Sequence, residues 1–174
     1  LPKIVTLSPF KKGDSKMAIY MKFGDIKGRV TTDGFKDWIE LTSFQLGVGR
    51  GVSSGAGGAQ REGTNPSISE ITVTKPFDVA SPKLYQDALA GVFDSKVEIK
   101  FTTTTKNKVD TYLAYELTKC GVSGYSLSSG GDNPSESISL NYTKIMLSPS
   151  PLDDAGSPKA GDKVTYDLTG MKTS

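Results

Sequence analysis

One stretch of this sequence, residues 37–51, combines an alternating apolar pattern with a change of phase, and this combination constrains the fold strongly. Ile39 and Leu41 alternate with polar residues, and the alternation resumes out of phase at Phe44 and Leu46. A half-buried strand has a period of two, so the shift requires a bend or an extra residue just before Phe44. Bent strands form the corners of barrels. The stretch therefore predicts a curved β structure.

The residues after the bent strand are rich in glycine and carry no apolar pattern. Residues 51–60 read Gly-Val-Ser-Ser-Gly-Ala-Gly-Gly-Ala-Gln, and such a segment cannot bury a face of its own. Pro66 holds Asn65 in an extended conformation, so the next strand can begin only after it. We therefore expect a long projecting loop between two strands.

Most of the remaining chain shows the alternation of β-strands. A second change of phase occurs between Tyr142 and Ile145, which predicts a second bent strand. The expected strands cover residues 19–23, 68–75, 95–104, 109–118, 121–127, 138–147 and 164–168. The chain is thus predicted to be mainly β.

The segment 81–91 is the one convincing helix. Ser81 is placed to cap it, Pro82 suits its first turn, and Gly91 can adopt the left-handed conformation that ends it. An apolar stripe is expected to face the sheets, formed by Leu84, Tyr85, Ala88 and Leu89.

The sequence argues against catalysis. It contains no histidine, which removes the commonest general base, the serine–histidine and cysteine–histidine nucleophile pairs, and the commonest transition-metal ligand. Gly47, Gly49 and Gly51 are spaced G-x-G-x-G, but neither a phosphate-loop lysine nor a helix follows them. We expect no catalytic residue, no cofactor and no metal. An esterase using one of the many serines would need lysine or a carboxylate as its base.

Charge and cysteine content exclude further classes. The net charge of +2 divides into +3 over residues 1–16 and −1 over the remainder, so we expect no basic face for nucleic acid. The single cysteine, Cys120, excludes an internal disulfide and is predicted to be a small buried residue. No apolar run is long enough for a membrane span, and no signal peptide is apparent. We expect synthesis in the cytoplasm.

Three ordered segments resemble the hallmark segments of Hcp, the haemolysin-coregulated tube protein family of bacterial type VI secretion. They are residues 18–28 (Ala-Ile-Tyr-Met-Lys-Phe-Gly-Asp-Ile-Lys-Gly), 38–48 (Trp-Ile-Glu-Leu-Thr-Ser-Phe-Gln-Leu-Gly-Val) and 78–84 (Asp-Val-Ala-Ser-Pro-Lys-Leu). The resemblance covers residues 17 to about 147. Residues 1–16 fall outside it and are interpreted as a leader or an added extension. A single domain is expected over 17–174, with a less similar tail after about 148.

The resemblance implies a β-barrel formed by two antiparallel sheets, with one short flanking α-helix and a long extended loop. It implies homo-hexameric rings that stack into a hollow tube, which a contractile sheath expels with a VgrG spike at its tip. It further implies that effectors travel in the lumen and that the tube is secreted into the medium or a target cell. A phage-like tail tube protein is the related alternative. The second alternative is a monomeric β-sandwich for carbohydrate binding or adhesion.

Carried onto this chain, the resemblance assigns two sets of residues. The loop that reaches the next ring contains Arg50, Gly51, Ser53, Ser54, Gly55, Gly57, Gln60, Arg61 and Asn65. Gln45 lies between two apolar residues and hence on the opposite face of its strand. We expect Gln45, together with Gly47, to face the lumen.

Overall fold

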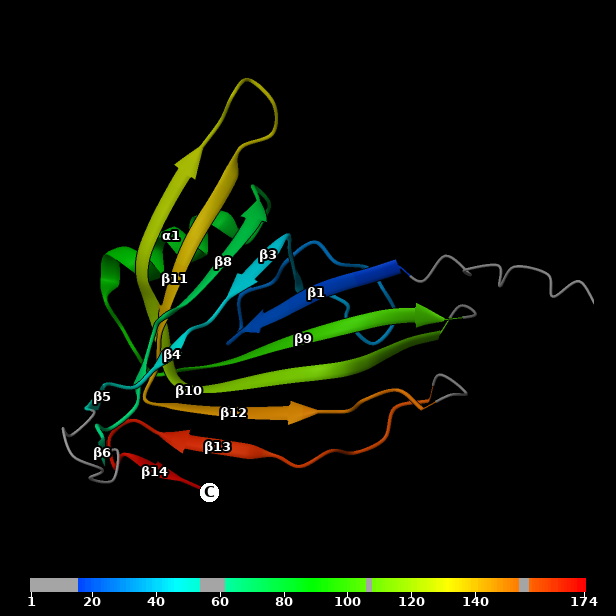
Figure 1. Ribbon diagram of the computed structural model, residues 1–174. Helices are drawn as coiled ribbons and strands as arrows, with labels where there is room; N and C mark the ends of the chain where they lie inside the picture. The colour runs from blue at the N-terminus through cyan, green and yellow to red at the C-terminus, as the bar shows by residue number, and fades with distance from the viewer. Residues whose placement is uncertain (1–15, 54–61, 106–107, 154–156) are drawn as a thin grey trace, which may run out of the picture.

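The computed structural model describes residues 16–53, 62–105, 108–153 and 157–174, and these form two antiparallel sheets and one helix (Figure 1). The long sheet contains β2 (Ile39–Leu41), β1 (Lys16–Phe23), β9 (Ser95–Thr105), β10 (Lys108–Ser128), β12 (Lys144–Pro149), β13 (Val164–Asp167) and β14 (Lys172–Thr173), in that order. The short sheet contains the second half of β10, β11 (Ser135–Asn141), β8 (Ile71–Pro76) and β3 (Ser43–Gln45). The prediction of a mainly β fold with two sheets and one helix is confirmed.

Two corners connect the sheets. At Thr42 the chain bends between β2 and β3, and β2 pairs with β1 while β3 pairs with β8. At residues 142–143 it bends between β11 and β12, which both pair with β10. Strand pairing therefore runs from β2 through β1, β9, β10, β11 and β8 to β3, and the chain itself connects β2 to β3 at Thr42. Both predicted changes of phase are confirmed as corners.

Two expectations about the strands are wrong. The expected strand 68–75 is divided between the end of β7 (Ser67–Ile68) and β8. Residues 109–118 and 121–127 were expected to form two strands, but both belong to β10, which runs through both sheets. Its pairing with β9 shifts between Leu117 and Cys120, and Lys119 has a φ of 49°. A bulge of this kind bends a strand without ending it. The break in the apolar pattern therefore marks a bend and not a turn.

The helix, α1 (Ser81–Ala90), differs from its prediction at both its start and its face. Ala80 is the N-cap residue, and the hydroxyl of Ser81 is engaged elsewhere. Gly91, with a φ of 63°, ends the helix as predicted. Leu84 is fully buried, but Tyr85 and Leu89 are 50% and 72% exposed. The apolar stripe is wider than the surface against which the helix packs.

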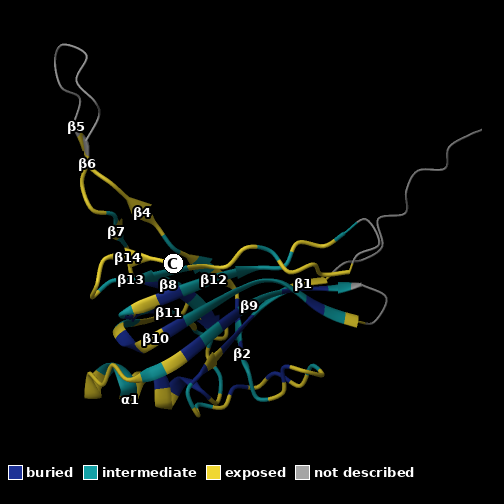
Figure 2. Ribbon diagram, turned by 90° about the horizontal axis from the view of Figure 1, so that it is seen from below, coloured by how far each residue is buried: buried dark blue, intermediate teal, exposed yellow. Residues whose placement is uncertain are grey.

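The hydrophobic core lies between the two sheets and beneath α1, as the dark positions in Figure 2 show. Both sheets and the helix supply it, and Cys120 lies fully buried within it, as expected. Its fully buried members include Met21, Phe23, Ile39, Ile71, Val73, Leu84, Ile99, Leu117, Ile138 and Leu140. The alternating positions of the sequence predicted most of this set.

A charged network is buried within the short sheet. The ammonium of Lys75 on β8 donates to Glu136 Oε2 on the neighbouring β11, and lies 2.8 Å from Asp78 Oδ1 and 3.0 Å from Ser81 Oγ. The hydroxyl of Ser81 donates to Glu136 Oε2 over 2.7 Å, and that of Tyr125 donates to Glu136 Oε1. Burial, followed by the bond to Glu136, raises the pKa of Tyr125. This network joins β8, β10, β11 and the start of α1.

Removing the cation of this network is expected to destabilise the fold strongly. Lys75→Met would leave Asp78 and Glu136 buried without their shared partner, at a cost of about 3–5 kcal/mol in the free energy of unfolding. The control is Lys27→Met, which breaks an exposed pair with Asp37 and should cost less than about 1 kcal/mol. Urea unfolding at one fixed protein concentration measures both variants. Equal midpoints would contradict a structural role for the network.

Candidate assembly surfaces

The glycine-rich segment begins and ends as an ordered hairpin, here called the arm (residues 46–69). Its stem contains β4 (Val48–Gly49) paired with β7 (Ser67–Ile68), and β5 (Val52–Ser53) paired with β6 (Glu62–Gly63). Further bonds join its two sides, including Ser69 N to Gly47 O at 2.8 Å and Thr64 N to Gly51 O at 2.9 Å. Figure 2 shows the stem of the arm extending away from the two sheets. The stem projects as expected, whereas the pairing of short strands along it was not predicted.

The predicted stacking residues divide between the stem and the tip of the arm. Arg50, Gly51, Ser53 and Asn65 lie on the stem. Asn65 approaches the turn before β14, since its Nδ2 lies 3.2 Å from the sulfur of Met171. The remaining predicted positions lie outside the described residues: Ser54, Gly55, Gly57, Gln60 and Arg61. Their role in stacking stays a prediction.

Glycines keep the stem narrow. A Cβ atom at Gly63 would lie 2.9 Å from Cδ of Arg50, and one at Gly51 would lie 3.0 Å from Oγ1 of Thr64. Val48 and Val52 on the same stem are 66% and 59% exposed. The arm therefore presents backbone and two apolar side chains to whatever lies beyond the subunit.

Gln45 belongs to an uncharged face of the short sheet. It is exposed, whereas Phe44 packs against the core, so Gln45 lies on the face opposite Phe44, and its position in a lumen stays a prediction. In register, Gln45 lies beside Thr72, and Thr72 beside Ser139. In the neighbouring row of the sheet, Ser43 lies beside Thr74, Thr74 beside Ser137, and Ser137 beside Ser126. The face formed by these two rows includes Ser43, Gln45, Thr72, Thr74, Ser126, Ser137 and Ser139. We call it the hydroxyl face. Gly47 is exposed two residues beyond Gln45.

Both edges of the short sheet lack a further strand within the described part of the chain. β3 pairs only with β8, and residues 121–128 of β10 pair only with β11. Along this part of β10, Val122 N donates to Asp87 Oδ2 on α1 over 2.9 Å. Unpaired edges of this kind are sites for pairing with another chain.

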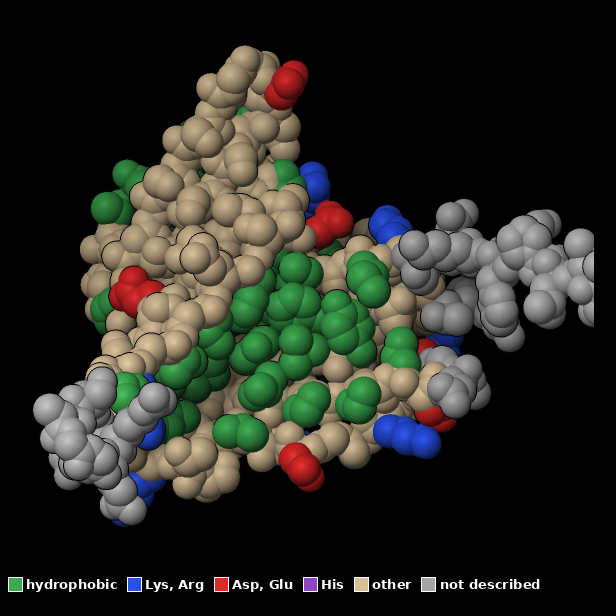
Figure 3. All heavy atoms as spheres, viewed as in Figure 1, with side chains coloured by type: hydrophobic (Ala, Val, Ile, Leu, Met, Phe, Trp, Pro, Cys, Tyr) green, Lys and Arg blue, Asp and Glu red, His purple; other side chains and the backbone are tan. Residues whose placement is uncertain are grey.

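An apolar groove lies where the long sheet extends beyond the short sheet. Figure 3 shows hydrophobic side chains gathered over the long sheet, beside the short sheet. The groove has a volume of about 270 Å³, and it is lined by Leu46, Val48 and Ile68 of the arm and by Tyr115, Ile145, Leu147, Val164 and Tyr166. The hydroxyl of Tyr166 is buried without a hydrogen-bond partner. A partly open apolar surface of this kind is typical of a contact site.

A second apolar surface lies on and after α1. Tyr85, Leu89, Val92 and Phe93 are all exposed there, and we call them the helix patch. The ring of Tyr85 lies 5.2 Å from that of Tyr125 on β10. The helix patch thus flanks the β10 edge of the short sheet. Sequence reasoning missed it because Tyr85 and Leu89 were assigned to the core.

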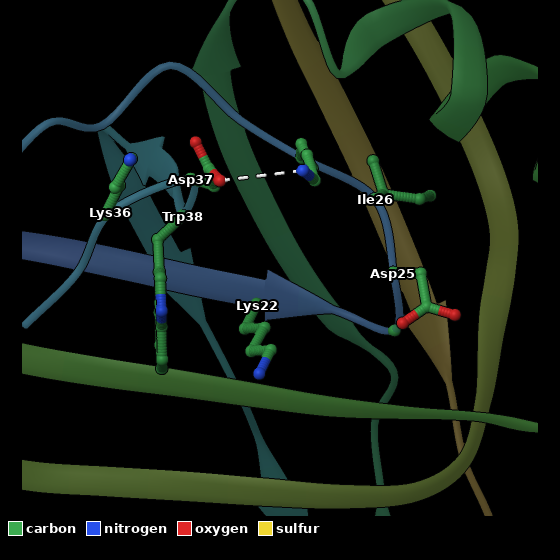
Figure 4. Close-up of a pocket in the computed structure, with 8 residues that line it drawn as sticks. Lys22, Asp25, Ile26, Lys36, Asp37 and Trp38 are labelled. Atoms are coloured by element: carbon green, nitrogen blue, oxygen red, sulfur yellow. Dashed lines mark ion pairs between the residues drawn. The ribbon is translucent and has the colours of Figure 1, made fainter.

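A polar pocket of about 240 Å³ lies at the turn between β1 and β2 (Figure 4). Lys27 Nζ and Asp37 Oδ2 form an exposed pair there at 3.8 Å, and Lys22, Asp25 and Lys36 add charges of both signs. Gly28 explains the shape of the turn, because a Cβ atom at this position would lie 2.2 Å from the carbonyl oxygen of Trp38. The close approach of the chain at this turn forms the pocket. Because its lining carries charges of both signs, it does not indicate one kind of ligand.

The described residues offer little reactive chemistry. They contain no cluster of three or more His, Cys, Asp and Glu that could hold a metal ion. Burial, with a smaller contribution from Asp87, raises the pKa of the Cys120 thiol to about 12. None of the helices within the described ranges is long and apolar enough to cross a membrane.

Two sheet edges that are unpaired within the described residues, a projecting arm and two apolar surfaces are typical of a protein that contacts other protein chains. The family model "Type VI secretion system effector, Hcp" matches residues 20–148. The chain therefore belongs to the Hcp family of type VI secretion.

Solved structures agree with this assignment. A type six secretion system protein is 30% identical, with a TM-score of 0.81 over 91% of this chain and 100% of its own. Hcp1 from Salmonella typhimurium shares the fold at 20% identity, with a TM-score of 0.70 over 91% and 99% of the two chains. The cap that terminates the tube of the anti-feeding prophage shares it at 11% identity, with a TM-score of 0.53 over 86% and 97%. None of the curated proteins compared with the chain matches it.

Cys120 is expected to react slowly with alkylating reagents in the folded protein. The thiolate is the reactive form, and a raised pKa lowers its population at pH 8. Alkylation at pH 8 should be at least about 100-fold slower in buffer than in denaturant, and should accelerate as the pH rises. Mass spectrometry over a time course measures the rate. Equal rates in buffer and in denaturant would contradict the buried position.

Proposed function

We propose that this protein is the structural subunit of the inner tube of a type VI secretion system. The observation that carries the proposal is the short sheet, which has an uncharged outer face and two edges without strand partners among the residues that the structure describes. Pairing of the β3 edge of one copy with the β10 edge of the next joins copies head to tail. Such a heterologous contact closes into a ring when the rotation between copies permits it. Rings of six follow from family membership.

In such a ring the hydroxyl face lines the lumen. Gln45 and its hydroxyl neighbours offer hydrogen bonds without fixed charge, so cargo of either sign meets no long-range repulsion from them. Effectors are then carried, and kept folded, inside the tube. The chain itself needs no catalytic activity for this role.

The arm connects successive rings. It projects beyond both sheets, and its exposed Val48 and Val52 provide apolar surface for a neighbouring copy. The further partners follow from the family: a VgrG spike at the tip, a contractile sheath around the tube, and secreted effectors inside it. Delivery to the medium or a target cell follows from the same role.

A phage-like tail tube is the second candidate, because the fold is shared with the cap of the anti-feeding prophage tube. Both candidates predict rings. A monomeric β-sandwich for binding or adhesion would leave both edges of the short sheet open to aggregation, which disfavours it.

Deletion of residues 55–60 should separate ring formation from stacking. The deletion removes the tip of the arm. It leaves intact the two edges of the short sheet that are proposed to pair between copies, the groove and the helix patch. Negative-stain microscopy should show rings for both proteins, and stacked tubes for the unaltered protein under conditions that favour stacking. A control replaces residues 55–60 with a Gly/Ser sequence of equal length, which tests whether side chains or length matter. Tubes formed by the deletion variant would contradict a stacking role.

A cysteine at position 45 tests the orientation of the hydroxyl face. Gln45→Cys should react with small maleimides in rings and tubes, but with large polymer-linked maleimides only in isolated subunits. Val79→Cys, at an exposed position that is not part of the hydroxyl face, serves as the control and should react with both reagents. Labelling of Gln45→Cys by the large reagent at equal rates in tubes and in subunits would overturn the assignment.

A further inference from the structure

The two apolar surfaces lie beside opposite edges of the short sheet. The groove adjoins the β3 edge, because Leu46 directly follows β3 and Phe44 on β3 stacks on Tyr115 at 5.0 Å. The helix patch adjoins the β10 edge, where Asp87 of α1 binds the backbone of Val122. Each edge of the short sheet thus has one uncovered apolar surface next to it.

Edge pairing between copies would bring these two surfaces together. When the β10 edge of one copy pairs with the β3 edge of the next, the helix beside β10 is carried toward the groove beside β3. The contact is heterologous, so each copy offers its helix patch on one side and its groove on the other. The contact continues the interface formed by the paired edges.

The chemistry of the two surfaces also matches. Tyr85 and Leu89 are four residues apart and therefore lie on one side of the helix. The groove lining contains no charged side chain, and its one buried unpaired polar atom is the hydroxyl of Tyr166. A tyrosine ring supplies both apolar area and a hydroxyl that can donate or accept. Tyr85 and Leu89 are therefore suited to fill this apolar lining, while the hydroxyl of Tyr85 can remain in water at its rim.

We infer that the helix patch of one copy docks into the groove of the neighbouring copy in the same ring. The inference rests on the proposed ring and adds the residues that secure it: Tyr85 and Leu89 on one side, and Leu147, Val164 and Tyr166 on the other. The competing occupant of the groove is the arm of a copy in the next ring, through Val52.

Paired cysteines distinguish these occupants. Leu89→Cys and Val164→Cys are made as two single variants, mixed as unfolded chains, refolded together and oxidised. Both positions are exposed in the single chain. The native Cys120 stays in place because it is fully buried. The matched mixture combines Val52→Cys with Val164→Cys. Each sample is divided between non-reducing electrophoresis and negative-stain microscopy.

The expected result is a disulfide-linked dimer in the Leu89→Cys and Val164→Cys mixture, in samples that show rings, and not in either single variant. The double variant on one chain should form a ladder up to the full ring. Rings without this dimer would overturn the inference and leave the proposed function intact. A dimer only in the Val52→Cys mixture would assign the groove to the arm and also overturn it. Absence of rings from the unaltered protein would instead contradict the proposed function.

Substitution of the helix patch gives a second readout. Leu89→Asp places a charge at an exposed position, so it should leave the folded monomer intact by circular dichroism while shifting the protein from rings to monomers in native mass spectrometry. Met17→Asp, also at an exposed position away from both surfaces, is the control and should keep rings. Rings of Leu89→Asp at the control's abundance would overturn the inference.

Discussion

The buried ion pair between Lys75 and Glu136 holds together the parts of the structure on which the proposed assembly depends. It joins two adjacent strands of the short sheet, and through Ser81 and Asp78 it also fixes the start of α1. Tyr125 extends it to β10. A buried ion pair contributes little net stability compared with apolar residues, but breaking one is costly. Its role here is to specify how the helix sits relative to the short sheet, which places the helix patch at one edge.

Two sharp corners and an open surface coexist in this fold. The corners at Thr42 and at residues 142–143 return the strands to their start, yet β12 and β13 extend the long sheet beyond the short one. That extension exposes the groove, and the unpaired edges of β3 and β10 remain at the sides of the short sheet. A protein that functioned alone would have to cover these features. In a ring, the neighbouring copy covers them.

The alternation of residues was enough to predict the corners, most of the core and the orientation of Gln45, because a period of two assigns each residue to a face. It could not predict that β10 is continuous, because a bulge within a strand and the end of a strand interrupt the alternating pattern in the same way. It also failed for Ser81, whose hydroxyl binds Glu136, a residue 55 positions away in sequence. Local cap preferences carry no information about such a distant partner. The groove was missed for the same reason, as it combines the arm, β10, β12 and β13.

The most direct test of the central claim is a cryo-electron microscopy map of the assembled protein at a resolution that separates strands. The account predicts six-membered rings in which the short sheets form one continuous inner wall. The β3 edge of each copy should pair with the β10 edge of the next, and Gln45 should face the lumen. A map in which the long sheets line the lumen, or in which the short-sheet edges of neighbouring copies lie apart, would contradict it.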